Sequence, residues 1–302
     1  MNAKSKNLKL PGLGRLGFIF EKSGQGVGFA GATGFETNLT AQVIRDGKPV
    51  PAREVMGFWS RFLNNVKGND TVIDLGSGLV TNVGVMAMAN ESVTLASPSG
   101  ARVHVLFLSN WHATGTGTTA AAVTDYKLQT ISTQGGQTPV AGTQSLATTT
   151  TLAAPIYQTV ATVSYTGTEA VTEWGLFTSN TLSSTTGTPF TNATATTFTA
   201  TGTPFTASSS TVQGLQQQIV EPGTTTVLGL IQSNTTSVAT LANNGTTGWF
   251  TRASGAAGST PGTTEAYTLR PVMWDHKVFS AINVNNGDSI QFTYRLTVVS
   301  GG

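Results

Sequence analysis

Threonine is the commonest residue in this chain, and it occupies roughly one position in six. Its side chain branches at Cβ and loses rotamer freedom against the preceding turn of a helix, so a threonine-rich chain disfavours helices. The same stiffness suits extended strands, and 35 glycines and 11 prolines supply residues for turns. We therefore predict a mainly β protein.

Charged residues are scarce and unevenly placed. The 16 basic and 14 acidic side chains make up 10% of the chain, against roughly 25% in ordinary globular domains. Residues 1–100 hold 17 of them, and residues 101–270 hold nine. The absence of cysteine excludes disulfide frameworks, thiolate metal sites and cysteine nucleophiles. A net charge of +2 is too small to favour nucleic-acid binding.

Residues 1–35 are predicted to form an extended arm. Basic side chains gather at its start, prolines and glycines break up its leucines, and glycines recur from Gly24 to Gly34. No continuous apolar stretch follows the basic residues, so we predict neither a secretory signal nor a membrane span. We expect the arm to lie on an acidic surface, and a frayed terminus is the alternative. The expected contacts come from Lys4, Lys6, Lys9 and Arg15.

An apolar stripe predicts a helix over residues 52–67. After Pro51, apolar residues recur with the 3.6-residue period of a helix, and Gly68 can end it. A second helix is predicted over residues 79–89, although Gly84 lowers its helix propensity. The stripe of the first helix consists of Val55, Phe58, Trp59, Phe62, Leu63 and Val66.

The clearest strand lies near the end of the chain. Apolar residues alternate with polar ones from Ile290 to Val298, which indicates a strand with one buried face. The turn at residues 285–288 leads into it, and the Asp46-Gly47 pair is typical of a hairpin turn. Further strands are predicted over residues 18–20, 39–44, 103–108, 156–165 and 170–177.

Residues 178–270 are predicted to form a threonine-rich β insertion. They contain Thr-Pro-Phe-Thr twice, and occasional phenylalanines give strands something to bury, which favours β-structure over a disordered linker. The remaining residues, 36–177 and 271–302, are predicted to form a β-sandwich core of the immunoglobulin-like or jelly-roll-like kind. Its expected core residues are Phe58, Trp59, Trp174, Phe177, Phe279, Phe292 and Tyr294.

The stretch from Val72 to Gly78, "VIDLGSG", is similar to the glycine-rich loop of methyltransferases that use S-adenosylmethionine. Val80 occupies the position of the third glycine, however, and regular βαβ alternation is absent. A turn next to a strand explains the stretch better, so we predict no cofactor site there.

Other candidate chemistry is sparse. Glu169 and Glu173 are four residues apart in a predicted strand and would face the same side, but two acids must flank a cleft for glycoside hydrolysis. No nucleophile elbow and no phosphate-binding loop is present in the sequence. We therefore predict no catalytic or metal-binding residue. The histidines weighed as metal ligands are His104, His112 and His276, and the tryptophans weighed as a sugar platform are Trp174, Trp249 and Trp274.

Several stretches resemble small virion structural proteins of tailed bacteriophages. Residues 159–177, "TVATVSYTGTEAVTEWGLF", and residues 275–297, "DHKVFSAINVNNGDSIQFTYRLT", resemble the C-terminal half of that family. Residues 111–128, "WHATGTGTTAAAVTDYKL", resemble its Gly-Thr-Gly-Thr-Thr-Ala-Ala stretch, and residues 79–89 resemble its upstream helix. The similarity covers about half of the chain. The family joins its last two blocks by a short connection, which residues 178–270 replace here.

The resemblance implies a non-enzymatic structural protein of a phage virion, in the first place a capsid decoration (cement) protein on the head shell. Its partners would be the major capsid protein or other virion subunits, within a homo-oligomer or a lattice. It would assemble in the host bacterial cytoplasm, where disulfides bring no gain. No nucleic acid, membrane or cofactor is expected. The alternatives are a neck or tail-fibre component, and a host-glycan-binding module that uses Trp249 or Trp274 as a stacking face.

Overall fold

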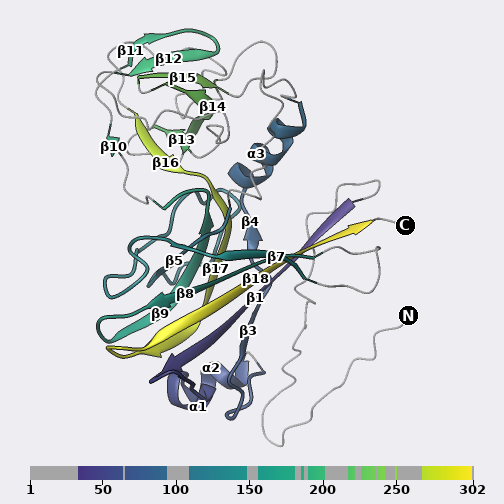
Figure 1. Cartoon of the computed structure of the whole chain (residues 1–302), viewed down its shortest axis with the longest axis vertical. Coiled ribbons are helices and arrows are strands. Elements are labelled where there is room, and N and C mark those ends of the chain that lie inside the picture. The colour runs from purple at the N-terminus through teal and green to yellow at the C-terminus, as the bar shows by residue number, and fades with distance from the viewer. Residues whose placement is uncertain are drawn as a thin grey trace, which may run out of the picture.

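The described part of the chain is mainly β, as predicted, with three antiparallel sheets and three short helices (Figure 1). The predicted strands at residues 18–20 and 103–108 lie outside the described residues, and so does most of the predicted arm. The computed structural model describes residues 33–63, 65–93, 109–147, 156–180, 185–186, 190–200, 217–221, 226–235, 237–241, 249 and 267–300.

The first sheet has six strands in the order β2-β1-β18-β8-β7, and β3 also pairs with β1. The predicted alternating strand at the end of the chain is its centre, and Leu39 of β1 lies opposite Tyr294 of β18. The hairpin between β1 and β2 closes through Asp46 and Gly47, which both have positive φ, as a tight hairpin turn requires. The strands are β1 (Thr33–Arg45), β2 (Lys48–Pro49), β3 (Ile73–Gly76), β7 (Thr143–Ala147), β8 (Ile156–Ser164) and β18 (Ser289–Ser300).

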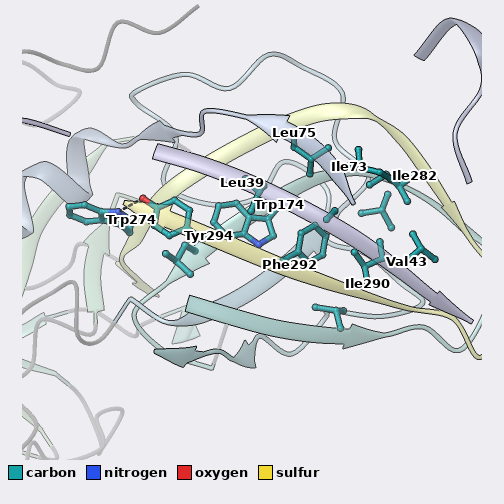
Figure 2. Packing of buried hydrophobic residues seen from close by; sticks show 14 of the residues in the cluster. Leu39, Val43, Ile73, Leu75, Trp174, Trp274, Ile282, Ile290, Phe292 and Tyr294 are labelled. Carbon is teal, nitrogen blue, oxygen red and sulfur yellow. Dashed lines mark hydrogen bonds between the residues drawn. The ribbon is translucent and has the colours of Figure 1, made fainter. Parts of the chain in front are cut away.

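The second sheet has five strands in the order β4-β17-β9-β5-β6. It packs with the first sheet in a sandwich-like arrangement, because side chains from both sheets form one buried cluster (Figure 2). In this cluster Trp174 of β9 stacks on Tyr294 of β18 at 5.5 Å between ring centres. The strands are β4 (Leu79–Val80), β5 (Trp111–Gly115), β6 (Val140–Ala141), β9 (Glu169–Phe177) and β17 (Met273–Val284).

Most of the expected core residues are buried. Trp174, Phe177, Phe292 and Tyr294 lie in the interior, and Phe279 is partly buried against it. The prediction was wrong for two others, because Phe58 and Trp59 are exposed.

The predicted helix over residues 52–67 is two short helices, α1 (Ala52–Val55) and α2 (Phe58–Leu63). Met56 is extended between them, with φ −126° and ψ 139°, and Gly57 follows it with low helix propensity. The break separates the apolar stripe: Val55 is buried, whereas the aromatic side chains of α2 point to solvent. Among the described residues, no helix is long and apolar enough to cross a membrane.

The helix predicted over residues 79–89 begins later, as α3 (Asn82–Val93), because Leu79 and Val80 form β4 and pair with β17. Thr81 caps it, since its hydroxyl oxygen accepts a hydrogen bond from the N–H of Gly84 at 3.0 Å. A Cβ on Gly84 would lie 2.8 Å from the carbonyl oxygen of Trp274. The glycine that argued against a helix therefore lets α3 approach β17 closely.

Gly84→Ala is expected to lower the free energy of unfolding by about 1–3 kcal/mol, because α3 must move away from Trp274. This loss outweighs the gain of about 1 kcal/mol in helix propensity. Gly57→Ala is the matched control, since a Cβ there meets nothing closer than 3.9 Å, and it should leave stability nearly unchanged. Urea denaturation measures both; equal stabilities would contradict the packing argument.

The third sheet has seven strands in the order β10-β16-β13-β14-β15-β12-β11, so the predicted insertion is β-structured. It has its own apolar cluster, in which Phe198 packs between Trp249 and Tyr267. This sheet lies at one end of the long axis of the molecule, and α1 and α2 lie at the other (Figure 1). The strands are β10 (Thr185–Thr186), β11 (Phe190–Ala193), β12 (Thr197–Ala200), β13 (Gln217–Val220), β14 (Val227–Asn234), β15 (Val238–Leu241) and β16 (Thr268–Pro271).

Candidate functional site

A buried ionic cluster joins the second sheet to the loop that follows β5. Glu173 comes from β9, His276 from the neighbouring β17, and Asp125 from the loop. His276 Nε2 lies 2.8 Å from Glu173 Oε1, and Nδ1 lies 2.7 Å from Asp125 Oδ2. Glu173 and His276 have no exposed surface.

Backbone groups complete the surroundings of Glu173. Its carboxylate accepts hydrogen bonds from the N–H groups of Gly117 at 3.1 Å, Gln129 at 2.6 Å and Thr130 at 3.2 Å. A Cβ on Gly115 or Gly117 would lie 2.5 Å from Glu173 Oε2, so only glycine fits at either position. The Gly-Thr-Gly sequence thus makes room for a buried carboxylate.

The hydrogen bonds of the ionic cluster favour the charged forms of Glu173 and His276. Burial alone would raise the pKa of Glu173, but the hydrogen bonds from His276 and the backbone lower it below its ordinary value. Burial alone would lower the pKa of His276, but its bonds to Glu173 and Asp125 raise it. His276 is therefore an imidazolium whose two N–H groups donate to two carboxylates.

This geometry does not suit catalysis by His276. A general base needs a ring nitrogen that can take a proton from a nucleophile, and a metal ligand needs a ring nitrogen with a free lone pair. Both nitrogens of His276 already donate to carboxylates. The ionic cluster instead fastens the loop of residues 116–130 onto the sheet.

Glu169 and Glu173 lie on one side of β9, as their spacing predicts, but they do not flank a cleft. Glu169 accepts hydrogen bonds from the N–H of Thr133, at 2.9 Å, and from the hydroxyl of Ser132. Both carboxylates therefore bind the same long loop. The pair is a structural clamp rather than an acid and base.

The histidines are not brought together as metal ligands in the described part of the chain. His104 lies outside it, and His112 is buried. The Nδ1 of His112 accepts a hydrogen bond from the indole N–H of Trp174 at 3.2 Å, and Nε2 lies 3.1 Å from the hydroxyl of Thr159. Burial lowers the pKa of His112 to about 3, so this ring is neutral and donates through Nε2. No group of three potential ligands was found among the described residues.

The glycine-rich stretch after residue 72 forms β3 and the connection to β4. Asp74 is exposed on β3 and accepts hydrogen bonds from Asn38 at 3.0 Å and from the N–H of Gly76 at 2.9 Å. Gly76 has φ +74°, and Gly78 packs directly on Asp275. The stretch is thus a strand of the first sheet and its connection to a strand of the second sheet, not the strand-to-helix loop of a nucleotide site.

Asp275 is a buried carboxylate that sequence reasoning missed. Neither of its oxygens has a well-aligned hydrogen-bond partner among the described residues, although the hydroxyl of Tyr294 and the N–H of Leu79 lie close by. A Cβ on Gly78 would lie 2.0 Å from Oδ1. Burial raises the pKa of Asp275 to about 7, because the cost of desolvating the carboxylate exceeds the stabilisation that it receives from the Tyr294 hydroxyl, the Leu79 N–H and the charges of His276 and Lys277.

The three tryptophans considered for sugar binding are all buried, so the alternative that uses Trp249 or Trp274 as a stacking face is wrong about these residues. The indole N–H of Trp249 donates to the carbonyl of Thr194 at 2.7 Å, and that of Trp274 donates to the hydroxyl of Tyr294 at 3.0 Å (Figure 2). Buried rings cannot stack on a glycan.

A small cavity lies beside the ring of Tyr126, between the second sheet and β16. Its volume is about 200 Å³, and Lys127 and Arg270 each hold their charge 5.8 Å from that ring. Pockets for small molecules are usually larger, at roughly 300–1,000 Å³. The cavity therefore does not mark a ligand site.

The candidate functional surface is the aromatic face of α2, which we call the α2 patch. It consists of Phe58, Trp59 and Phe62, which are 65%, 71% and 68% exposed. The predicted contact residues Lys4, Lys6, Lys9 and Arg15 lie outside the described residues. Comparison with models of known families, with curated proteins and with solved structures finds no match to this chain.

Proposed function

We propose that this chain is a non-enzymatic structural protein of a tailed bacteriophage virion, in the first place a capsid decoration protein on the head shell. One observation carries the proposal. The segments that resemble virion proteins, residues 111–128, 159–177 and 275–297, come together in the fold. They contain the three adjacent strands β5, β9 and β17 of one sheet and the adjacent pair β8 and β18 of the other.

The shape of the molecule supports a role in which one end attaches and the other projects. The α2 patch lies at one end of the long axis, and the threonine-rich third sheet lies at the opposite end (Figure 1). Large exposed aromatic side chains mark interaction surfaces. The partners would be the major capsid protein or other virion subunits, and assembly would take place in the host cytoplasm.

The number of copies in purified particles tests the position. A shell protein follows the lattice and is present in hundreds of copies, whereas a neck or tail-fibre component is present in about a dozen or fewer. Quantitative mass spectrometry of particles measures this ratio. Absence of the chain from particles would refute the proposal altogether.

Replacing Lys4, Lys6, Lys9 and Arg15 by serine is expected to reduce incorporation into particles. Exposed charge contacts contribute roughly 0.2–1 kcal/mol each, so losing four of them should weaken the affinity for the particle by roughly fourfold to several hundredfold. Lys48→Ser with Lys127→Ser is the control, because both lysines are exposed outside the arm. Unchanged incorporation of the arm variant would show that the arm does not attach the protein.

A further inference from the structure

The α2 patch is a cluster of mutually contacting rings rather than three separate side chains. The rings of Phe58 and Trp59 lie 5.4 Å apart at 77°, and those of Trp59 and Phe62 lie 6.2 Å apart at 89°. Edge-to-face contacts of this kind are the favoured arrangement of aromatic rings and stabilise each pair by roughly 0.5–1.5 kcal/mol. The α2 patch thus offers a preformed apolar surface to solvent.

The size of the α2 patch indicates what can cover it. An aromatic side chain buries roughly 150–250 Å², so three rings that are about two-thirds exposed present roughly 300–500 Å². A stable interface between two folded proteins buries roughly 800 Å² on each side. The α2 patch is too small for such an interface by itself, but it suits a single extended segment.

We propose that residues 8–20 of the same chain cover the α2 patch. Alternate residues of an extended segment share one side. The even positions of this segment therefore form an apolar side interrupted only by Gly12 and Gly14. The odd positions carry both charges, Lys9 and Arg15, together with Leu13 and Ile19. The apolar side consists of Leu8, Leu10, Leu16, Phe18 and Phe20.

The length of chain before β1 allows this contact. The 13 residues of β1 span about 43 Å, and the strand ends beside α1, where Arg45 lies 3.8 Å from Glu54 (Figure 1). Residue 20 precedes Thr33 by 13 positions, so the chain between them reaches up to about 43–47 Å. Residues 8–16 have still more chain available. The segment can therefore return along β1 to α2.

The contact would orient the arm for attachment, a consequence that rests on the proposed function. With the apolar side held on α2, Lys9 and Arg15 face solvent. A segment ordered in this way loses less conformational entropy when it meets an acidic surface than a free arm does. The α2 patch thus acts as a platform for the cationic side of the arm.

Acrylamide quenching of Trp59 in the isolated protein tests the contact without any particle. Of the other tryptophans, Trp174, Trp249 and Trp274 are buried and Trp111 is partly buried. Subtracting the signal of the Trp59→Phe variant isolates Trp59. Covering the ring should lower its quenching constant roughly threefold relative to a chain without residues 1–20, because acrylamide quenches an indole in proportion to the accessible area of the ring.

Two variants of full length separate the sides of the segment. Serine at positions 8, 10, 16, 18 and 20 should raise the quenching constant of Trp59 to that of the truncated chain. The matched variant Lys9→Ser with Arg15→Ser should keep Trp59 shielded, although the proposed function predicts weaker incorporation for it. Equal quenching in the full and truncated chains would refute the contact. Shielding that depends on protein concentration would also refute it, since a second copy would then cover the α2 patch.

Discussion

Glu173→Ala is expected to lower the free energy of unfolding by about 3–5 kcal/mol, because it leaves the buried imidazolium of His276 with one carboxylate fewer. It also leaves the N–H groups of Gly117, Gln129 and Thr130 without their acceptor. Urea denaturation measures the change. An unchanged m-value, the slope of the free energy of unfolding against urea concentration, verifies that the variant still unfolds in two states. A loss below about 1 kcal/mol would show that the ionic cluster does not stabilise the fold.

Two comparison variants make the result specific. Glu169→Ala removes a carboxylate from the same side of β9, but that carboxylate is half-buried, so its loss should cost about 1 kcal/mol. Glu173→Gln keeps the shape and an acceptor oxygen for the loop while it removes the charge, so it should fall between the two alanine variants. This variant also remains informative if Glu173→Ala does not fold.

The contribution of the ionic cluster has a defined pH window. The pKa of Glu173 is lowered in the folded state, so its contribution is complete above the ordinary value of 4.5 and disappears as the pH falls through the folded pKa. The pKa of His276 is raised, so its contribution is complete below the ordinary value of 6.5 and disappears as the pH rises through the folded pKa. The difference between the wild type and Glu173→Ala should therefore be largest between pH 4.5 and 6.5.

The β-structure could be predicted because its signals are local. Alternation from Ile290 to Val298 gives a strand with one buried side, and Asp46-Gly47 gives a hairpin, wherever the rest of the chain lies. The side chains of Phe292 and Tyr294 are buried for the same reason. Elements of this kind depend on neighbours two or three positions away.

The stripe over residues 52–67 shows the limit of such signals. Periodicity predicts that residues share one face of a helix, but it does not predict whether that face packs on the core or lies in solvent. Met56 leaves the helical conformation, so Val55 turns to the core while Phe58 and Trp59 turn to solvent. Gly57 was the available signal for the break, because glycine is a poor helix former.

The ionic cluster could not be predicted, because its members are far apart in the sequence. Asp125 and His276 are 151 positions apart, and only the pairing of β17 with β9 places His276 near Glu173. The sequence contains one indirect indication of the buried carboxylate. Gly115 and Gly117 lie at the start of the loop, where a side chain would meet the Glu173 carboxylate, but a glycine in the sequence does not show which residue it packs against.

Asp275→Asn is expected to change how stability depends on pH. The pKa of Asp275 is raised from 3.8 to about 7 in the folded state, so the folded chain binds the proton more tightly than the unfolded chain. Stability therefore falls as the pH rises between these values and is level above them. Asparagine has the same shape and no charge, so this fall should be absent in the variant.

The expected size of this change in stability follows from the interval between the two pKa values, 3.8 and about 7. One unit of pKa corresponds to about 1.4 kcal/mol. As the pH rises from 5 to 8, the free energy of unfolding of Asp275→Asn should therefore increase by about 3 kcal/mol relative to that of the wild type. The buried amide adds a cost that does not change with pH, because the side chain has no well-aligned hydrogen-bond partner among the described residues. The change with pH is therefore the decisive quantity, not the stability at one pH. Asp74→Asn, which removes an exposed carboxylate of β3, is the control. Parallel wild-type and Asp275→Asn curves would show that the buried carboxylate is not the source of the dependence.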